Sequence, residues 1–437
     1  MREHLNRPFR SRSDTLPAAR SRPAAAARGA GPDGAGPSTA DLGGRGSVRA
    51  AAALLAVVML TGGAIGRAVV PSGVSELLVY FGTYTGETSK GIYVSRLDLA
   101  SGALTAPALA AETPSPSFLA VHPSGGFLYA ANEVRTFNGQ PGGGVSGFAI
   151  DRRTGGLTAL NQQSSRGDGA VHLVVDKAGR NVLVANYGGG SVAVLPLATD
   201  GTLKPASAFV QHTAPNPAAQ PPVVPRAHAI NLDPANRFAY VPDLGLDQVR
   251  IYRFGSETGS LEAADPPFVA LNPGAGPRHF AFHPGGRFAY VINEKTLTLT
   301  AFRHDERTGT LTQVQTVSTL PPGQGVETGF STAEVFVHPS GRFLYGSNRG
   351  HNSIAVFAID EASGRLTFVE ATPTQGSTPR GFGIDPTGAY LIAANQRSDS
   401  VVGFRIDRAT GRLTPTGHTV AVGSPVSVEF VEPRGRE

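Results

Sequence analysis

Residues 277–318 read PRHFAFHPGGRFAYVINEKTLTLTAFRHDERTGTLTQVQTVS, and this stretch decides the fold. It contains four short runs of apolar or alternating residues, at 278–283, 288–291, 297–302 and 311–317. Turn-forming residues separate these runs, with Pro-Gly-Gly at 284–286, Asn-Glu-Lys at 293–295 and Asp-Glu-Arg-Thr-Gly at 305–309. Alternation with a period of two, bounded by turn residues, is typical of β-strands. The stretch therefore predicts a unit of four antiparallel strands, which is one blade of a propeller.

The same pattern occurs seven times along the chain. In each copy an anchor residue, most often Pro, ends the first run; the anchors are 123, 177, 234, 284, 339, 386 and 433. Consecutive anchors are 47 to 57 residues apart. Self-similarity with a period near 50 residues is the signature of a repeat architecture such as a β-propeller.

The seventh copy stops at Pro433, when only its first strand has been made. The start of the repeat region supplies the missing strands, with one run at 78–81 and another at 92–97. Sharing one blade between the two ends pairs strand edges that would otherwise be exposed. We therefore predict an all-β, seven-bladed β-propeller over residues 77–437, with four antiparallel strands per blade and with the N- and C-terminal segments sharing the closing blade.

Composition and charge exclude several classes of function. The chain of 437 residues has no Cys, which excludes disulfides and thiolate chemistry. Its net charge of +5 comes from residues 1–50, which hold nine Arg and four acidic residues, whereas the rest holds 29 basic and 29 acidic residues. A neutral repeat region does not favour a nucleic-acid partner. Motifs of zinc proteases, serine hydrolases, P-loop nucleotide binding and EF-hands are absent from the sequence.

The region before the repeats divides into two segments. Residues 1–49 are rich in Arg, Ala, Gly and Pro, so we expect them to be disordered. Residues 50–68 contain an apolar run, 50–65, preceded by Arg45 and Arg49, which resembles an export signal. The run is short for a membrane span, which needs roughly 20 residues. We expect an exported protein without a stable membrane span; an uncleaved anchor, or a cytoplasmic protein with a misassigned start, are the alternatives.

Comparison of the copies separates structural positions from functional ones. The residue before the anchor is His122, Asp176, Asp233, His283, His338 or Asp385, and the ninth residue after it is Asn132, Asn186, Asp243, Asn293, Asn348 or Asn395. A residue type repeated at a repeated position indicates a structural role. We therefore expect the three His to be turn residues and the Asn or Asp to cap loop backbone.

Two other positions vary sharply between copies. Six residues before the anchor stand Ser117, Val171, His228, Arg278, Ala333, Arg380 and Ser427; ten residues after it stand Glu133, Tyr187, Leu244, Glu294, Arg349 and Gln396. In an antiparallel hairpin that turns just after the anchor, these two positions lie at the same end. The ionisable residues among them are therefore expected to converge on one mouth of the central channel. Solvated rim charges are the alternative interpretation.

These residues also carry a resemblance to a known family. Residues 275–279 (AGPRH), 291–294 (VINE), 346–354 (GSNRGHNSI) and 378–382 (TPRGF) resemble the seven-bladed lactonase family, which includes propeller-type 6-phosphogluconolactonases and fungal carboxymuconate-lactonizing enzymes. The resemblance extends over all seven blades. This chain departs from the family where Arg226-Ala227-His228 replaces a His-x-His pair, and where the loop 214–225 lacks an Arg-Gln.

The resemblance implies a site without metal or cofactor, with His228, Arg278, Glu294 and Arg349 as its catalytic residues. We place Arg380, Glu133, Gln396 and His279 around it as substrate-binding residues. Opposite charges lower a carboxyl pKa, so Glu294 is expected to stay ionised between the arginines. His228 is expected to titrate near neutrality and to transfer the proton.

The function expected from this site is hydrolysis of a sugar-type lactone, as in 6-phosphogluconolactonases. The substrate is a small molecule, and we expect the protein to be a monomer. One alternative is a cycloisomerase or secreted lactonase that acts on another carboxylated lactone. Another is an extracellular propeller that binds a ligand without catalysis.

Overall fold

The computed structural model describes residues 74–216, 220 and 222–434. The predicted leader, 1–49, and the apolar segment, 50–68, lie outside these residues. Among the described residues, no helix is long and apolar enough to cross a membrane.

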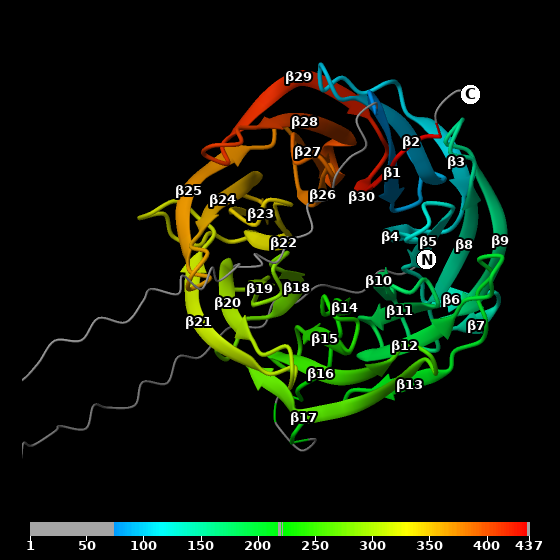
Figure 1. The fold of residues 1–437 in the computed structure, drawn as a ribbon, viewed down its shortest axis with the longest axis vertical. Coiled ribbons are helices and arrows are strands. Elements are labelled where there is room, and N and C mark those ends of the chain that lie inside the picture. The colour runs from blue at the N-terminus through cyan, green and yellow to red at the C-terminus, as the bar shows by residue number, and fades with distance from the viewer. Residues whose placement is uncertain (1–73, 217–219, 221, 435–437) are drawn as a thin grey trace, which may run out of the picture. The chain divides into compact units, whose positions relative to one another are not determined.

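Seven four-stranded antiparallel sheets surround a central axis, as Figure 1 shows. The innermost strands are β4 (Pro116–Val121), β10 (Ala170–Val175), β14 (Asn231–Leu232), β18 (Pro277–Phe282), β22 (Ser331–Val337), β26 (Pro379–Ile384) and β30 (Pro425–Val431). The second strands are β5 (Phe127–Asn132), β11 (Asn181–Asn186), β15 (Phe238–Asp243), β19 (Phe288–Asn293), β23 (Phe343–Arg349), β27 (Tyr390–Asn395) and β1 (Glu76–Thr83).

The third and outer strands complete each blade. The third strands are β8 (Gly144–Ile150), β12 (Ser191–Pro196), β16 (Gln248–Gly255), β20 (Thr298–His304), β24 (Ser353–Ile359), β28 (Ser400–Ile406) and β2 (Gly91–Asp98). The outer strands are β9 (Leu157–Ser164), β13 (Ala208–Gln211), β17 (Ser260–Ala270), β21 (Leu311–Ser318), β25 (Leu366–Pro373), β29 (Leu413–Ala421) and β3 (Ala108–Glu112). The remaining elements are a small hairpin, β6 (Thr136–Phe137) and β7 (Gln140–Pro141), and a short 3-10 helix, η1 (Gln396–Ser398).

The two ends of the repeat region meet in one blade. Its strand order is β3-β2-β1-β30, so β30 is the inner strand and the N-terminal strands build the rest. Leu78 pairs with Val431 and Phe81 with Val428. The predicted seven blades and the shared closing blade are therefore confirmed.

The positions that repeat among the copies have structural roles. The three histidines reach the turn of the next blade, with Nε2 of His122, His283 and His338 lying 2.9, 3.0 and 2.9 Å from the carbonyl oxygens of Gly179, Gly341 and Gly388. Four asparagines donate Nδ2 to loop carbonyls before their blade's inner strand: Asn132 to Pro114, Asn186 to Ser165, Asn348 to Thr319 and Asn395 to Thr374. The structural interpretation is confirmed for the three histidines and these four asparagines, whereas Nδ2 of Asn293 donates to the Thr298 and Thr300 hydroxyls instead.

A buried tyrosine in the second strand connects most neighbouring blades. Its hydroxyl donates to a carbonyl in the next blade's turn before the outer strand: Tyr80 to Gly155, Tyr129 to Gly201, Tyr240 to Gly309, Tyr290 to Gly364, Tyr345 to Gly411 and Tyr390 to Leu99. In the remaining blade the equivalent residue is Leu183, and Ser207 donates to Gly259 instead, at 2.9 Å. The apolar core follows the same interfaces, because each of its seven clusters contains residues of neighbouring blades.

Replacing Tyr345 with Phe removes one of these connections, a 2.8 Å hydrogen bond between fully buried groups. We expect the free energy of unfolding to fall by about 1 kcal/mol, as for loss of a buried hydrogen bond. Reversible denaturation in urea measures this change. Tyr93→Phe is the control, since within the described ranges the Tyr93 hydroxyl takes part in a single hydrogen bond, which is 3.3 Å long and exposed. Equal stability of the two variants would contradict the role of the tyrosines.

Candidate active site

The site is at the end of the channel where the inner strands begin. In β18 the pairing register shifts between Pro277 and His279, and β4, β10 and β26 carry the same irregularity at their starts. Such a bulge re-aims side chains and is frequent beside active sites. Here it allows two consecutive residues, Arg278 and His279, both to contact residues of other blades.

Three predicted catalytic residues form one ion-pair cluster. Oε2 of Glu294 lies 3.1 Å from Nε of Arg278 and 3.0 Å from Arg349. Both guanidinium groups also donate to backbone, Arg278 to the Ala333 carbonyl at 2.7 Å and Arg349 to the Thr332 carbonyl at 2.9 Å. These four contacts hold the two guanidinium groups in place, and both of them contact the same carboxylate oxygen, Oε2 of Glu294.

The cluster keeps free hydrogen-bonding capacity. Oε1 of Glu294 has no hydrogen bond to the described residues, and Nε of Arg349 is buried without a partner among them. Burial, followed by the charges of Arg380 and Arg349, lowers the pKa of Arg278 to about 9, so it remains charged at neutral pH. The cluster therefore presents two cations and one carboxylate oxygen to a ligand.

A second group lies close to the first, since Glu133 and Arg380 line one cavity with Arg278. The Tyr84 hydroxyl donates to Oε2 of Glu133 at 2.6 Å, and the guanidinium of Arg380 lies 5.4 Å from the centre of the Tyr84 ring. Burial raises the pKa of Tyr84, so its hydroxyl stays protonated. Arg380 and Glu133 were predicted for the site, whereas Tyr84 was missed.

The repeat itself contains the signal for Tyr84. Tyr80 of β1 occupies the position of Tyr129 in β5, so four residues later Tyr84 corresponds to Glu133. If the repeat is followed through the blade that the two ends share, Tyr84 falls at the variable position ten residues after the anchor. The same blade needs a second correction: Thr83 pairs with Pro425 as Asn293 pairs with Pro277, so Val426, and not Ser427, corresponds to Arg278.

His228 is placed as predicted, but its protonation differs from the prediction. It is buried, its ring centre lies 5.1 Å from that of Tyr187 and 5.2 Å from that of His279, and its Nδ1 has no partner among the described residues. Burial, together with Arg278, His279 and Arg380, lowers its pKa well below 6.5. His228 is therefore neutral at pH 7 and does not titrate near neutrality.

The floor of the site consists of a small cavity and a buried pair of side chains, His279 and Glu334. Only the first of these two residues was predicted for the site. His279, predicted to bind substrate, lies with Nδ1 2.7 Å from Oε1 of Glu334, which was not predicted. The cavity has a volume of about 10 Å³ and is lined by Ser117, Phe118, Glu133, Val171, Arg278, His279, Glu334, Arg380 and Val426. A further carboxyl, that of the half-buried Glu429 on β30, interacts electrostatically with Glu334.

Gln396 was also predicted for the site, but its described contacts do not connect it to the other site residues. Its backbone amide donates to Thr378, and within the described part of the chain no side-chain hydrogen bond joins it to the cluster. Its position at the start of η1 is nevertheless equivalent to those of Glu133 and Glu294.

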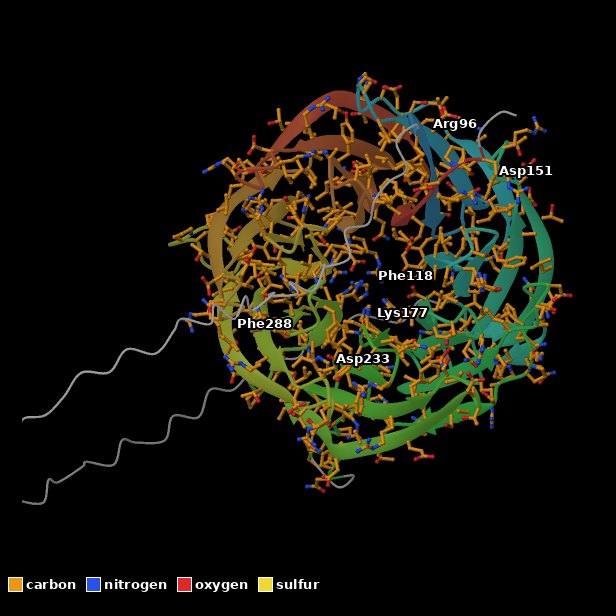
Figure 2. All side chains as sticks on the ribbon, in the orientation of Figure 1. Arg96, Phe118, Asp151, Lys177, Asp233 and Phe288 are labelled. Carbon is orange, nitrogen blue, oxygen red and sulfur yellow. The ribbon has the colours of Figure 1, made fainter. Side chains whose placement is uncertain are left out.

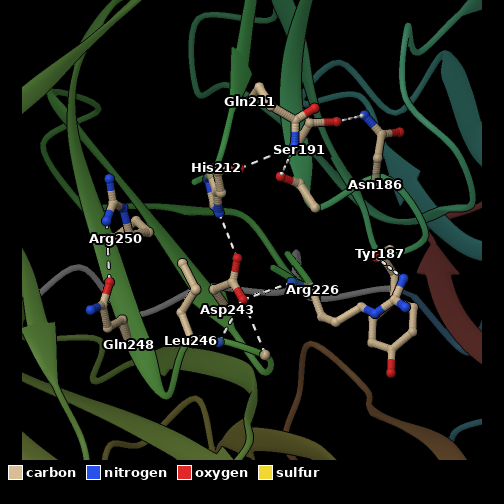
Figure 3. A network of polar contacts seen from close by, with 12 residues as sticks. Asn186, Tyr187, Ser191, Gln211, His212, Arg226, Asp243, Leu246, Gln248 and Arg250 are labelled. Atoms are coloured by element: carbon tan, nitrogen blue, oxygen red, sulfur yellow. Dashed lines mark hydrogen bonds and ion pairs between the residues drawn. The ribbon is translucent and has the colours of Figure 1, made fainter. Parts of the chain in front are cut away.

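A separate network connects His212 to Asp243 and Asp243 to Arg226 (Figure 3). Nδ1 of His212 lies 2.6 Å from Oδ2 of Asp243, whose Oδ1 accepts the backbone N–H of Arg226 at 2.7 Å. The Arg226 side chain donates to the Gly188 carbonyl at 2.8 Å and covers the ring of Tyr187. Asp243 stands where the other copies have Asn, and both of its carboxylate oxygens accept hydrogen bonds here, whereas an amide has a single acceptor oxygen.

Metal ligands form no cluster in the described ranges. No group of three or more His, Asp or Glu side chains is arranged there to hold a metal ion.

Comparison with known proteins gives a consistent set of relatives. Residues 78–430 match the family described as Lactonase, 7-bladed beta-propeller. A 6-phosphogluconolactonase of Bacillus subtilis is 36% identical over 315 residues, which cover 71% of this chain and 86% of that protein. A 6-phosphogluconolactonase of Formosa agariphila is 30% identical over 313 residues, covering 70% and 86%. The structure of a periplasmic gluconolactonase of Pseudomonas aeruginosa is 36% identical, with a TM-score of 0.76, and covers 82% of this chain and 100% of that one.

The half-buried carboxyl of Glu429 leads to a prediction about stability and pH. Burial, and secondarily Glu334, raises its pKa from 4.5 to about 8 in the folded protein. Its contribution to stability is therefore complete below pH 4.5 and is lost as pH rises through 8. Glu429→Gln cannot ionise, so we expect its free energy of unfolding, relative to wild type, to increase from pH 5 to pH 9. Denaturant titrations at pH 5, 7 and 9 measure the difference, and parallel pH dependences would contradict the burial of this charge.

Proposed function

The chain belongs to the seven-bladed β-propeller lactonase family, and from this premise we propose that it hydrolyses a sugar-type lactone of the 6-phosphogluconolactone kind at the channel mouth. The observation that carries the proposal is the placement of Glu294 between Arg278 and Arg349, with one carboxylate oxygen still free. The relatives named as 6-phosphogluconolactonases support the substrate class.

In the proposed reaction the two arginines bind the lactone carbonyl oxygen. Water adds to the carbonyl carbon, and the negative charge that develops on the oxygen is stabilised by the adjacent guanidinium groups. Their hydrogen bonds to the Ala333 and Thr332 carbonyls hold them in place before the substrate arrives. Preorganised donors of this kind contribute about 3–4 kcal/mol each to transition-state stabilisation.

Glu294 has two tasks in this proposal. Its Oε2 holds both arginines, and its Oε1 orients the attacking water and accepts its proton. His228 remains neutral and uses its unpartnered Nδ1 to hydrogen-bond the substrate. Arg380, Tyr84 and Glu133 form the opposite wall and contact the hydroxyl or acidic groups of the sugar. Gln396 completes this wall at its edge.

A second candidate is a gluconolactonase that acts on the unphosphorylated lactone outside the cytoplasm. It is favoured by the likeness to the periplasmic Pseudomonas aeruginosa enzyme and by the export-like segment 50–68. Mass spectrometry of the N-terminus of the protein, expressed from its full reading frame, tests export. We expect a mature chain that begins after the apolar run, and an intact leader on the purified protein would contradict this.

The catalytic proposal is tested with 6-phosphoglucono-δ-lactone and glucono-δ-lactone as substrates. We expect Arg349→Ala and Glu294→Gln to lower kcat/KM by about 100-fold or more, because each removes a group that acts on the developing charge. A pH-indicator assay, corrected for spontaneous opening, measures the rates. Comparison of the two lactones in the wild type distinguishes the two candidate substrates.

Glu306→Gln is a matched control, because Glu306 pairs with an arginine at the surface, 3.5 Å from Arg237. It should retain wild-type rates. Undiminished hydrolysis in both site variants would refute the assigned residues. A wild type that opens no lactone, including muconolactone-type substrates, would instead favour a propeller that only binds its ligand.

A further inference from the structure

Lactone opening needs two proton movements. One proton leaves the attacking water, for which Glu294 is placed, and one proton must reach the oxygen that leaves the ring. His228 is a poor source for the second proton, because burial and its cationic neighbours keep the imidazole neutral. Another group in the site has to supply it.

The pair formed by His279 and Glu334 is a buried acid that lines the cavity of the site. Nδ1 of His279 lies 2.7 Å from Oε1 of Glu334, and the backbone N–H of Val335 also contacts that oxygen, at 3.0 Å. Both side chains are buried within the channel. The centre of the Phe118 ring, near the axis in Figure 2, lies 5.7 Å from that of His279 and 4.1 Å from that of His172, so aromatic rings pack against the pair.

The far side of the imidazole faces the site. Nε2 of His279 is buried and has no partner among the described residues, and His279 lines the cavity shared with Arg278 and Arg380. The Ser117 hydroxyl lines the same cavity and is also without a described partner. A volume of about 10 Å³ is close to the space of one water-sized oxygen. The cavity can therefore receive a single oxygen atom of a ligand or water.

The surroundings keep both members of the pair uncharged below about pH 7. Burial raises the pKa of Glu334 to about 7, although Arg278, the Val335 amide, His172 and Arg380 act in the opposite direction. Glu429 faces it from β30. Burial, with Arg278, Arg380 and Arg349, lowers the pKa of His279 well below 6.5. A carboxylic acid beside a neutral imidazole can share its proton with Nδ1, which leaves the N–H on Nε2.

We propose that His279 is the proton donor to the leaving oxygen of the lactone and that Glu334 is the positioning residue that replenishes it; this inference rests on the proposed function. As the bond between the carbonyl carbon and the ring oxygen breaks, Nε2–H of His279 is transferred to that oxygen. Nδ1 takes the proton of Glu334, so the imidazole stays neutral and the carboxyl becomes a carboxylate. The proton that Glu294 removed from water leaves to solvent, and solvent reprotonates Glu334.

The pH dependence of kcat tests the proposal without any variant. Because Glu334 acts in its protonated form, kcat of the wild type should fall as pH rises above about 7. Glu334→Gln keeps the size of the side chain but has no proton to give. We expect its kcat at pH 6 to be about 100-fold lower, since general acids contribute about 10²–10⁴-fold, with KM changed less than threefold and no fall above pH 7.

The leaving group separates acid catalysis from structural damage. Dihydrocoumarin releases a phenolate, which needs little protonation because phenols ionise near a pKa of about 10. Glu334→Gln should therefore lose much less activity on dihydrocoumarin than on glucono-δ-lactone, whereas a distorted site would lose both. Glu306→Gln is the matched control, as it removes a surface carboxyl that pairs with Arg237 and should retain the wild-type profile.

Each outcome decides between the proposals. A wild-type kcat that is flat from pH 6 to 9, or a Glu334→Gln variant with an unaltered profile, overturns the inference while the proposed function stands through the Glu294 and Arg349 variants. Equal losses on both lactones assign Glu334 a purely structural role and overturn it as well. A wild type that hydrolyses no lactone overturns the proposed function and this inference together.

Discussion

The pairing of β30 with β1 is the interaction on which the whole ring depends. It joins the two ends of the described chain edge to edge, and without it one blade would lack its inner strand and neighbouring blades would lose their packing surface. The other interfaces repeat one solution, in which a buried tyrosine hydroxyl bonds a turn carbonyl of the next blade. Because the core lies between blades, the stability of each blade depends on its neighbours.

This arrangement also explains how so many charged groups can be buried at one place. Seven blades point the starts of their inner strands at the same axis, so residues far apart in sequence become neighbours. Arg278, Glu294 and Arg349 come from two adjacent blades, and Arg380, Tyr84 and Glu133 come from three others. Contacts elsewhere hold the ring together, so packing does not dictate which residues stand at the channel mouth. These positions can therefore carry polar side chains.

The sequence was sufficient for the fold and for most of the site because both are encoded by repetition. The period defines the blades, and a residue that breaks the pattern, such as Arg278 or Glu294, stands out against its counterparts. Tyr84 was missed because its repeat is divided between the chain ends, and Glu334 because its position, five residues before the anchor, was not among the four positions compared. The neutral state of His228 could not be predicted, since it depends on burial and on cations contributed by other blades.

Leu78 lies opposite Val431, just as Val121 in β4 lies opposite Leu128 in β5. The ends of the repeat region therefore lie where every other blade has the hairpin turn between its first two strands. Geometrically, the repeat region is equivalent to a closed ring of blades that is opened at one of seven equivalent hairpins. A circular permutant that joins these ends with such a turn and opens another hairpin would keep all seven blades. The contacts described at the channel mouth do not depend on which hairpin is opened.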